Sequence, residues 1–447
     1  MEWLGAVPEC WEVMRLRHAV NLNPSKSEAA SLEPDTKVSF LPMEAVGEDG
    51  SLSLNQTRPI STVKNGYTYF RNGDVTIAKI TPCFENGKGA LMRGLKEGIG
   101  FGTTELIVAR PHQDRITSEF LAFLFRSAEF RLLGEGEMYG AGGQKRVPDS
   151  FVREFDTALP PLEEQAAIVA FLDRETGKID ALVDEQRRLI ELLKEKRQAV
   201  ISHAVTKGLD PDVAMKDSGV EWLGEVPEHW EVMPFKRVIQ GIESGTSVNA
   251  TDIPSDNTEV AVLKTSCVYT GQFDHTKNKV VVENEIDRVS CPLRAGSLIV
   301  SRMNTPDLVG AAGFVDSAPS NIFLPDRLWQ VSLKSEDVNT EFAHLWTQSD
   351  IYRSQIKSTC TGTSSSMKNL GQGDFGGFLF VNPPITEQEQ IVSELNIELD
   401  KYDDLTVKAN HAITLLQERR TALISAAVTG KIDVRTVSKA QTESGAA

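Results

Sequence analysis

The sequence lacks the long apolar segments and the metal-binding patterns that mark several large classes of protein. No apolar run reaches the roughly eighteen residues that a membrane-spanning helix needs, and no signal peptide is present. We therefore expect a cytoplasmic protein with no membrane partner. The five cysteines have no Cys-x-x-Cys spacing and the seven histidines are scattered, so we expect reduced thiols and predict no metal site.

Catalytic motifs are scarce as well. The chain has no Gly-x-x-x-x-Gly-Lys-Ser/Thr loop, so ATP chemistry on this chain is not expected. The stretch Asn382-Pro383-Pro384-Ile385 resembles the Asn-Pro-Pro-aromatic motif of adenine methyltransferases, but Ile385 stands where an aromatic residue stacks on a flipped base. No glycine-rich cofactor loop and no Ser/His/Asp or Cys/His set stands out. We therefore predict no catalytic residues.

The overall charge is acidic. Lys and Arg number 47 against 63 Asp and Glu, which gives a formal net charge of −16. This balance argues against a nucleic-acid binder, because phosphate contacts need clustered basic side chains. Charge can nevertheless be segregated by face, and partner subunits can supply a basic surface. The apolar content of 40% is that of a folded soluble protein, and 447 residues suit two to four domains.

One long stretch occurs twice. Residues 160–210 recur as residues 383–433 without a gap, so that Gln165 matches Gln388 and Ser202 matches Ser425, 223 residues later. The opening of the chain also recurs, and Trp11 matches Trp230 at an offset of 219. The whole chain is therefore a tandem duplication in the order globular, helical, globular, helical.

Each helical block is predicted to hold a short helix followed by a long one. The double proline starts the first helix, and Gly177 is expected to break the first copy. A helix of about thirty residues is roughly 45 Å long. Its apolar stripe is Ile179, Leu182, Leu189, Leu193 and Val200. Neither long helix can bury such a stripe alone, so we expect an antiparallel coiled coil; the alternative is that each helix packs on its own domain.

The globular blocks are predicted to be mixed α/β domains that share one scaffold and carry two different surfaces. Each has β-branched runs bounded by turn residues, then a helix, then a polar or glycine-rich loop. Strands are expected at 37–43, 74–80 and 104–111, and at 260–268, 297–303 and 328–333; helices at 119–133 and 341–357; loops at 134–148 and 359–374.

Polar and aromatic side chains in these loops are the candidate contacts to DNA. Arg, Lys, Asn and Gln pair with base edges, while Ser, Thr and backbone amides bind phosphates. Each residue alone is more often solvated surface, and only the duplicated placement favours a binding role. The candidates are Lys64, Tyr67, Lys79, Phe84, Asn86, Lys88, Tyr139, Gln144, Lys145, Arg146, Arg302, Asn304, Thr363, Ser365, Lys368 and Asn369.

These features together resemble the specificity subunit of a type I restriction–modification system. The resemblance rests on the Pro-Pro-x-x-Glu-Gln openings at 160–165 and 383–388, and on the helix ends at 197–206 and 420–429. The repeated Glu-Trp-Leu-Gly-x-Val-Pro-x-x-Trp opening, which begins at Glu2, is similarly typical of that family.

The resemblance implies a non-catalytic subunit that binds double-stranded DNA. Each globular block would be a target-recognition domain that reads one half of a split, asymmetric site, and the paired helices would hold the two apart. A span of roughly 45 Å suits half-sites about one turn of B-DNA apart. Two modification subunits would carry S-adenosylmethionine and methylate adenine, and motor-nuclease subunits would use ATP and Mg²⁺ to translocate and cleave DNA.

We therefore predict a mixed α/β protein of two target-recognition domains separated by a pair of long antiparallel coiled-coil helices, tandem-duplicated with pseudo-twofold symmetry. The predicted parts are recognition domains at 1–159 and 211–382 (with a short linker at 211–217), helical repeats at 160–210 and 383–434, and a disordered tail at 435–447. Two rivals are a coiled-coil scaffold with no DNA role and a self-standing adenine methyltransferase.

Overall fold

The computed structural model describes residues 4–141, 143–256, 258–360 and 367–434. The predicted tail at 435–447 lies outside the described residues. The chain forms two compact units: unit 1 is Met1–Arg187 with Asn410–Ala447, and unit 2 is Arg188–Ala409. This division cuts both long helices, and the predicted block boundaries stay predictions. Among the described residues, no helix is long and apolar enough to cross a bilayer.

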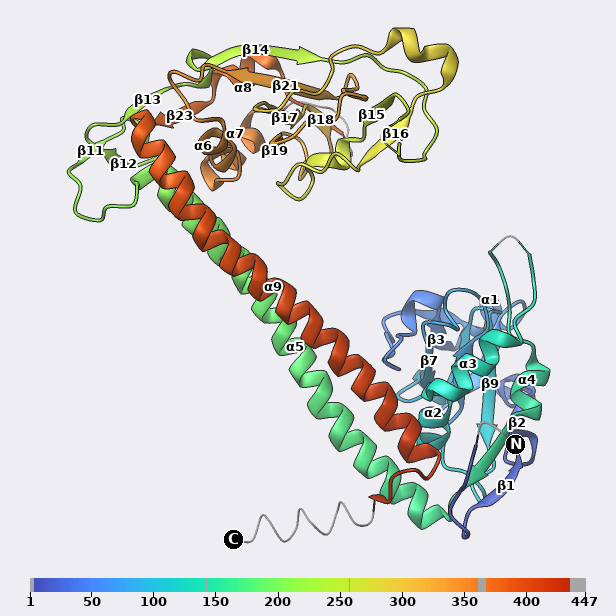
Figure 1. The fold of residues 1–447 in the computed structure, drawn as a ribbon. Coiled ribbons are helices and arrows are strands. Elements are labelled where there is room, and N and C mark those ends of the chain that lie inside the picture. The colour runs from blue at the N-terminus through green and yellow to red at the C-terminus, as the bar shows by residue number, and fades with distance from the viewer. Residues whose placement is uncertain (1–3, 142, 257, 361–366, 435–447) are drawn as a thin grey trace, which may run out of the picture. The chain divides into compact units, whose positions relative to one another are not determined.

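Unit 1 is built on an antiparallel four-stranded sheet in the order β2-β9-β6-β7. Its central strands are largely buried on both faces. Ile77 and Ile107 share a cluster with Phe120 of α2 and Phe130 of α3 on one face (Figure 1). On the other face, Ala78 and Val108 share a cluster with Leu41 and Phe70 of a second sheet. The elements are β2 (Val20–Leu22), β9 (Leu106–Pro111), β6 (Val75–Ala78), β7 (Gly89–Leu91), α2 (Ser118–Arg126) and α3 (Ala128–Gly136).

A second, mixed sheet of unit 1 has the order β4-β3-β8-β5, with β3 and β8 parallel. A separate pair, β1 with β10, joins the chain opening to the strand that leads into the first long helix. The elements are β4 (Thr57–Pro59), β3 (Lys37–Leu41), β8 (Ile99–Gly102), β5 (Thr68–Arg71), β1 (Glu12–Arg15), β10 (Asp156–Leu159), α1 (Ile60–Val63) and α4 (Asp149–Glu154).

Unit 2 repeats the first sheet in full and the second sheet in part. Its antiparallel sheet β14-β21-β17-β19 has the same strand order as β2-β9-β6-β7. Its second sheet, β16-β15-β20, has the same antiparallel and parallel pairings as β4-β3-β8 and, among the described residues, lacks a strand at the place of β5. The elements are β14 (Ile239–Ser244), β21 (Leu328–Leu333), β17 (Leu298–Ser301), β19 (Ala312–Phe314), β16 (Asn278–Val280), β15 (Ala261–Leu263), β20 (Ile322–Phe323), α6 (Thr340–Thr347), α7 (Asp350–Thr359) and α8 (Gln372–Gly377).

Three short strand pairs complete unit 2. The pair β13 with β23 matches β1 with β10, β11 pairs with β12, and β18 pairs with β22. Their bounds are β13 (Glu231–Pro234), β23 (Leu379–Asn382), β11 (Met215–Asp217), β12 (Glu225–Pro227), β18 (Met303–Asn304) and β22 (Lys368–Asn369). The predicted scaffold with two different surfaces therefore corresponds to one shared sheet that is repeated in full and a second sheet that is repeated only in part.

Each helical block is one continuous helix, so the predicted short and long helices are wrong. Helix α5 (Leu162–Lys207) has 46 residues and α9 (Ile385–Val428) has 44. At 1.5 Å per residue they are about 69 Å and 66 Å long, not 45 Å. Gly177 lies inside α5 on its exposed side and does not break it. An exposed glycine costs a helix only about 1 kcal/mol, which the packing of the rest of the helix offsets.

Within each unit the two helices run antiparallel (Figure 1). In unit 1, Phe171 of α5 shares a buried cluster with Ile424 of α9, and in unit 2, Ile201 of α5 shares one with Ile391 of α9. The same clusters contain sheet-domain residues such as Phe120 and Phe342. Both predicted packing modes therefore occur together: the helices pair, and their ends also pack on the sheet domains.

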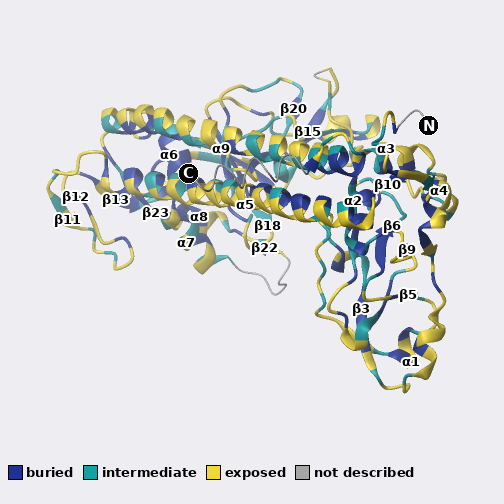
Figure 2. Ribbon diagram, turned by 90° about the horizontal axis from the view of Figure 1, so that it is seen from below, coloured by how far each residue is buried: buried dark blue, intermediate teal, exposed yellow. Residues whose placement is uncertain are grey.

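The buried seam of α5 differs from the predicted stripe. Ile179 and Leu193 are buried as expected, but Leu182 and Leu189 are 45% and 40% exposed, and Val183 is buried instead. The spacing Ile179, Val183, Gln186, Ile190, Leu193, Arg197 alternates four and three residues, which is the pattern of a coiled-coil seam. Figure 2 shows the long exposed faces of α5 and α9.

Each predicted helix over 119–133 and 341–357 is in fact two helices. The first breaks at Ser127, whose hydroxyl accepts a hydrogen bond from the N–H of Phe130 (3.3 Å), and the second breaks at Ser349, which accepts from Tyr352 (3.3 Å). Both serines have extended backbone angles and act as N-caps. The break therefore follows from a capping residue at equivalent places in the two units.

A buried glutamine fixes the start of each long helix to its sheet domain. Oε1 of Gln165 accepts from the N–H of Thr117 (2.9 Å), and its Nε2 donates to the carbonyls of Arg115 (2.8 Å) and Pro160 (2.9 Å). In unit 2, Oε1 of Gln388 accepts from the N–H of Asn339 (2.8 Å). The glutamine of the repeated Pro-Pro-x-x-Glu-Gln motif therefore has a structural role, because it joins the helix to the sheet domain.

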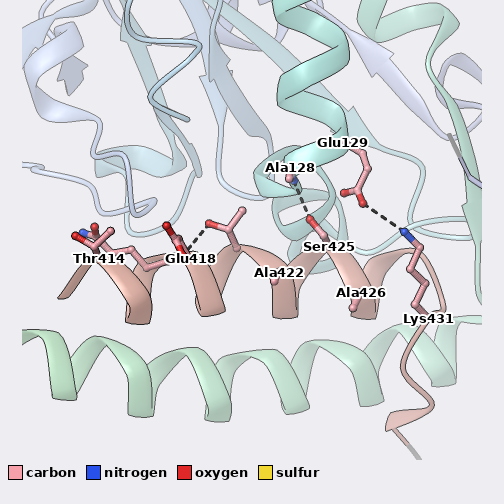
Figure 3. A pocket seen from close by; sticks show the side chains of 10 residues that line it. Ala128, Glu129, Thr414, Glu418, Ala422, Ser425, Ala426 and Lys431 are labelled. Atoms are coloured by element: carbon pink, nitrogen blue, oxygen red, sulfur yellow. Dashed lines mark hydrogen bonds and ion pairs between the residues drawn. The ribbon is translucent and has the colours of Figure 1, made fainter. Parts of the chain in front are cut away.

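The far end of each helix is held by a serine. In unit 1, Oγ of Ser425 accepts from the N–H of Ala128 (2.9 Å), and Lys431 pairs with Glu129 (3.6 Å), as Figure 3 shows. In unit 2, Oγ of Ser202 accepts from the N–H of Asp350 (3.0 Å). Since Ser202 matches Ser425, each unit uses the start of one repeat and the end of the other.

We expect Gln388→Ala to destabilise unit 2 by about 1–3 kcal/mol, because the N–H of Asn339 and the carbonyl of Pro383 lose their partner in a buried site. Urea unfolding followed by tryptophan fluorescence measures this change, since Trp230, Trp329 and Trp346 are buried in this unit. Gln390→Ala is the control: its side chain is exposed, and the free energy of unfolding should move by less than about 0.5 kcal/mol. Equal effects of the two changes would contradict the role of Gln388.

Candidate nucleic-acid interface

Two loops that lie far apart in the sequence form one small ribbon in unit 1. The N–H of Thr81 donates to the carbonyl of Lys145 (3.0 Å), and the N–H of Val147 donates to the carbonyl of Lys79 (2.8 Å). Tyr139 and Arg146 exchange backbone hydrogen bonds of 3.1 and 2.9 Å on the other side. We call residues 79–81, 139 and 145–147 the loop ribbon of unit 1. It joins both loops that carry candidate residues.

Glycine permits the turn that closes this ribbon. Gly140 has φ 139° and Gly143 has φ 76°, both in the region that favours glycine. A Cβ at Gly140 would lie 2.6 Å from the carbonyl oxygen of Gln144. The turn therefore requires glycine, because of its backbone angles and the close approach at Gly140. The turn brings Tyr139 back beside Arg146.

Unit 2 has an equivalent loop ribbon. Strand β18 pairs with β22, so that Met303 opposes Asn369 and Asn304 opposes Lys368. The N–H of Leu370 donates to the carbonyl of Arg302 (2.8 Å). The equivalent bond in unit 1 runs from the N–H of Val147 to the carbonyl of Lys79. We call residues 302–304 and 368–370 the loop ribbon of unit 2.

The two ribbons carry different side chains on one backbone pattern. In unit 1, the N–H of Lys79 donates to the carbonyl of Glu105 (2.8 Å), and in unit 2 the N–H of Arg302 donates to that of Arg327 (3.1 Å). Glu105 therefore corresponds to Arg327. The four matched positions are Lys79, Glu105, Lys145 and Arg146 in unit 1, and Arg302, Arg327, Lys368 and Asn369 in unit 2.

Glu105 and Arg146 form a two-bond ion pair. Nε of Arg146 donates to Oε2 of Glu105 (2.9 Å), and Nη2 donates to Oε1 (2.9 Å). The hydrogen bonds and charge of Arg146 hold the pKa of Glu105 below its ordinary value, against the effect of partial burial. The carboxylate is therefore ionised at neutral pH, and the guanidinium is held in one orientation.

Glu105 and Arg327 were not among the sequence candidates. Each lies one residue before a central strand of the shared sheet, at an offset of 222. An alignment of the two blocks strand by strand would have placed them together. Glu105 lies beside Lys79 because β9 pairs with β6, and Arg327 lies beside Arg302 because β21 pairs with β17. These neighbours become visible only when the strand pairing is known.

Some candidates are exposed on the ribbons and others are not. Tyr139 is 65% exposed, and Gln144 and Lys145 are exposed beside it. Phe84 is 3% exposed and packs against Phe130, so its ring is part of the core in this structure. Asn304 is buried at 9% exposure.

The amide of Asn304 has partners within the protein. Its Nδ2 donates to the hydroxyl of Tyr269 (2.9 Å) and lies 3.2 Å from Oγ of Ser301. Its Oδ1 accepts from the N–H of Thr305 (2.9 Å). The structure thus gives Asn304 the geometry of a residue that orders its own turn. Thr363 and Ser365 lie outside the described residues.

Four other candidates of unit 1 lie away from the ribbon. Lys64 is the C-cap of α1, and Tyr67 directly precedes β5 and packs edge-on against Phe40 of β3 at 5.0 Å. Asn86 and Lys88 line a hollow beside α5 and α9. The hollow is of mixed charge, because its lining has five acidic and four basic side chains, so it does not form a basic surface for phosphates. Within the described residues, no group of three or more acidic, His or Cys side chains could hold a metal ion.

Comparison with known proteins decides the family. The model of the type I restriction modification DNA specificity domain matches residues 8–192. The EcoEI specificity subunit of Escherichia coli is 25% identical over 497 aligned positions, which cover 94% of this chain and 83% of that subunit. The EcoAI specificity subunit of E. coli is 40% identical over 196 positions, covering 42% of this chain and 33% of that one. The chain belongs to the specificity subunits of type I restriction–modification systems.

Solved structures agree with this specificity subunit in fold. One chain, from work on the complex assembly and conformational transition of the type I R-M system, aligns with a TM-score of 0.72 at 16% identity and covers 96% of this chain and 100% of its own. The HsdS subunit from Thermoanaerobacter tengcongensis aligns with a TM-score of 0.50 at 17% identity over 95% and 98%. The predicted fold class, family and role as a specificity subunit rather than a catalytic one are confirmed.

We expect the Glu105 carboxyl to titrate below the ordinary glutamate pKa, because Arg146 stabilises its charged form. The interaction therefore contributes stability above the unfolded-state pKa and is lost as the pH falls through the lower, folded-state value. ¹³C NMR of carboxyl-labelled glutamate in the specificity subunit, with the signal assigned by Glu105→Gln, measures this. Arg146→Ala should return the midpoint toward the ordinary value; an unchanged midpoint would contradict the pair.

Proposed function

We propose that this specificity subunit reads a split, asymmetric double-stranded DNA site, with one half-site for the sheet domain of each unit. The observation that supports this most is the pair of loop ribbons. A shared backbone pattern carries an acidic Glu105 and a basic Arg146 in unit 1, where unit 2 has Arg327 and Asn369. Side chains of these types read base edges, so unlike sets favour unlike half-sites.

The acidic net charge is compatible with this role because basic side chains gather on the ribbons. Lys79, Lys145 and Arg146 belong to one, and Arg302 and Lys368 to the other. Positive charge gathered near the bases reduces the cost of approaching the phosphates, while the remaining surface stays acidic. The interface is thus local rather than spread over the molecule.

The proposed partners follow from the family. Two modification subunits, which carry S-adenosylmethionine, would methylate adenine in each half-site, and motor-nuclease subunits would use ATP and Mg²⁺ to translocate and cleave DNA. This chain would supply DNA recognition and the attachment surface. Its two units repeat one framework, which suits two copies of the same partner.

The test is a methylation map. The specificity subunit is co-expressed with its modification partner, and N6-methyladenine is located by single-molecule sequencing. We expect a split motif with two short defined halves around a fixed gap. Exchange of residues 1–158 for those of a relative should change one half only. No new methylation with an active, co-purifying partner would overturn the proposal and favour a scaffold without a DNA role.

Lys145→Ala should weaken DNA binding about equally for all sequences. Lys145 is exposed on the ribbon, and a lysine that contacts phosphate contributes affinity without sequence information. In the assembled complex, the slope of log affinity against log salt should fall by about one. Glu137→Ala, an exposed change of the opposite sign in the same loop, is the control and should not reduce the slope. An altered methylation motif for Lys145→Ala would contradict a phosphate role.

A further inference from the structure

We propose that Arg146 reads a guanine in the half-site of unit 1 and that Glu105 is the positioning residue that orients its guanidinium. This inference rests on the proposed function and names one base that the ribbon recognises. It depends on four features of the described residues: the atoms that form the ion pair, the direction of the remaining donors, the exposure of the neighbours and the contrast with unit 2.

The ion pair occupies one edge of the guanidinium. Glu105 accepts from Nε and Nη2, each at 2.9 Å, which uses two of the five N–H donors of the arginine. No other hydrogen bond from this side chain to a described residue is present. Three donors remain, two on Nη1 and one on Nη2. One N–H of Nη1 and the remaining N–H of Nη2 point in the same direction, away from Glu105, and form a second pair of donors. The O6 and N7 acceptors of guanine match such a pair in the major groove.

The carboxylate fixes where that second edge points. An unsupported arginine loses side-chain freedom when it binds, and a charge-assisted two-bond pair removes most of that freedom beforehand. The backbone of Arg146 is held as well, by its exchange of hydrogen bonds with Tyr139. A preorganised guanidinium discriminates between bases, because a wrong base leaves its donors unpaired.

The neighbours leave the outer edge open to a large ligand. Tyr139 and Arg146 are cross-strand partners, so their side chains leave the ribbon on the same face. Tyr139 is 65% exposed, and the side chain of Arg146 is 38% exposed. The exposed aromatic ring adds a surface for backbone or base contact beside the arginine.

The equivalent position of unit 2 cannot make the same contact. Asn369 stands where unit 1 has Arg146, and Arg327 stands where it has Glu105. An asparagine carries no guanidinium edge, and an arginine cannot act as the carboxylate that orients one. The guanine preference therefore belongs to one half-site only, which makes the inference testable within a single methylation map.

The experiment maps methylation by the complete complex with Arg146→Lys, Arg146→Ala and Glu105→Gln. We expect one guanine, in the half that changes when residues 1–158 are exchanged, to become tolerant of other bases. Preference for that guanine should fall about 5- to 140-fold for both Arg146 variants, the equivalent of one good two-bond base contact. Glu105→Gln should relax the same position by a smaller factor, since the arginine remains but is held less firmly.

Two controls separate base reading from folding and charge. Arg93→Ala removes an arginine of the same unit that pairs with Glu119 at 2.8 Å, and Arg93 lies beyond the opposite end of β6 from the ribbon. Lys145→Ala removes a positive charge from the ribbon itself. Neither variant should change the motif. Arg146→Lys keeps the charge and, if it co-purifies with the modification subunit, is folded.

Three results would overturn the inference in distinguishable ways. If Arg146→Ala lowers methylation of all sites equally, Arg146 contacts phosphate. If the motif and its strength are unchanged, the Glu105–Arg146 pair is a surface ion pair only. If Arg146→Ala relaxes the position but Glu105→Gln does not, Glu105 has no positioning role. Failure of the proposed function differs from all three, because the wild-type complex would then produce no split motif.

Discussion

A buried glutamine amide at the start of each long helix determines how the rest of each unit is arranged. Gln165 joins the start of α5 to the first turn of α2, and Gln388 joins α9 to α6 in the same way. An amide can satisfy a donor and an acceptor at once, which no apolar side chain can do in a dry site. With Ser425 and Ser202 at the far ends, this fixes the shared sheet relative to the helices inside each unit.

The loop ribbons depend on backbone hydrogen bonds and leave their side chains to vary. Lys79 and Arg302 occupy one position, and Arg146 and Asn369 another, with the same donors and acceptors between the strands. Because the ladder requires no particular side chain, a change of residue there alters what the surface binds at little cost in stability. The separation of a fixed frame from a variable surface is what a recognition subunit needs.

Much of the fold could be predicted from the duplication, and the failures have identifiable causes. A gapless repeat gives the long helices, but it does not show that an exposed Gly177 is tolerated or that Val183 rather than its neighbour Leu182 is buried. Ser127 looks like an ordinary helix residue until its capping bond is seen. At the interface, the two candidate loops of unit 1 were predicted, but Glu105 was missed because its partner Arg146 lies 41 residues away in the sequence.

The division of the long helices between the units also sets an order of folding during synthesis. Unit 2 is one contiguous stretch, Arg188–Ala409, whereas unit 1 needs residues from both ends of the chain. The hydrogen bond between Ala128 and Ser425 joins residues 297 positions apart. Such distant contacts form late, since the ribosome must first release the last helix. Unit 1, whose sheets are made first, is therefore completed last, and until then Phe171 and Leu172 of α5 have no partner from α9.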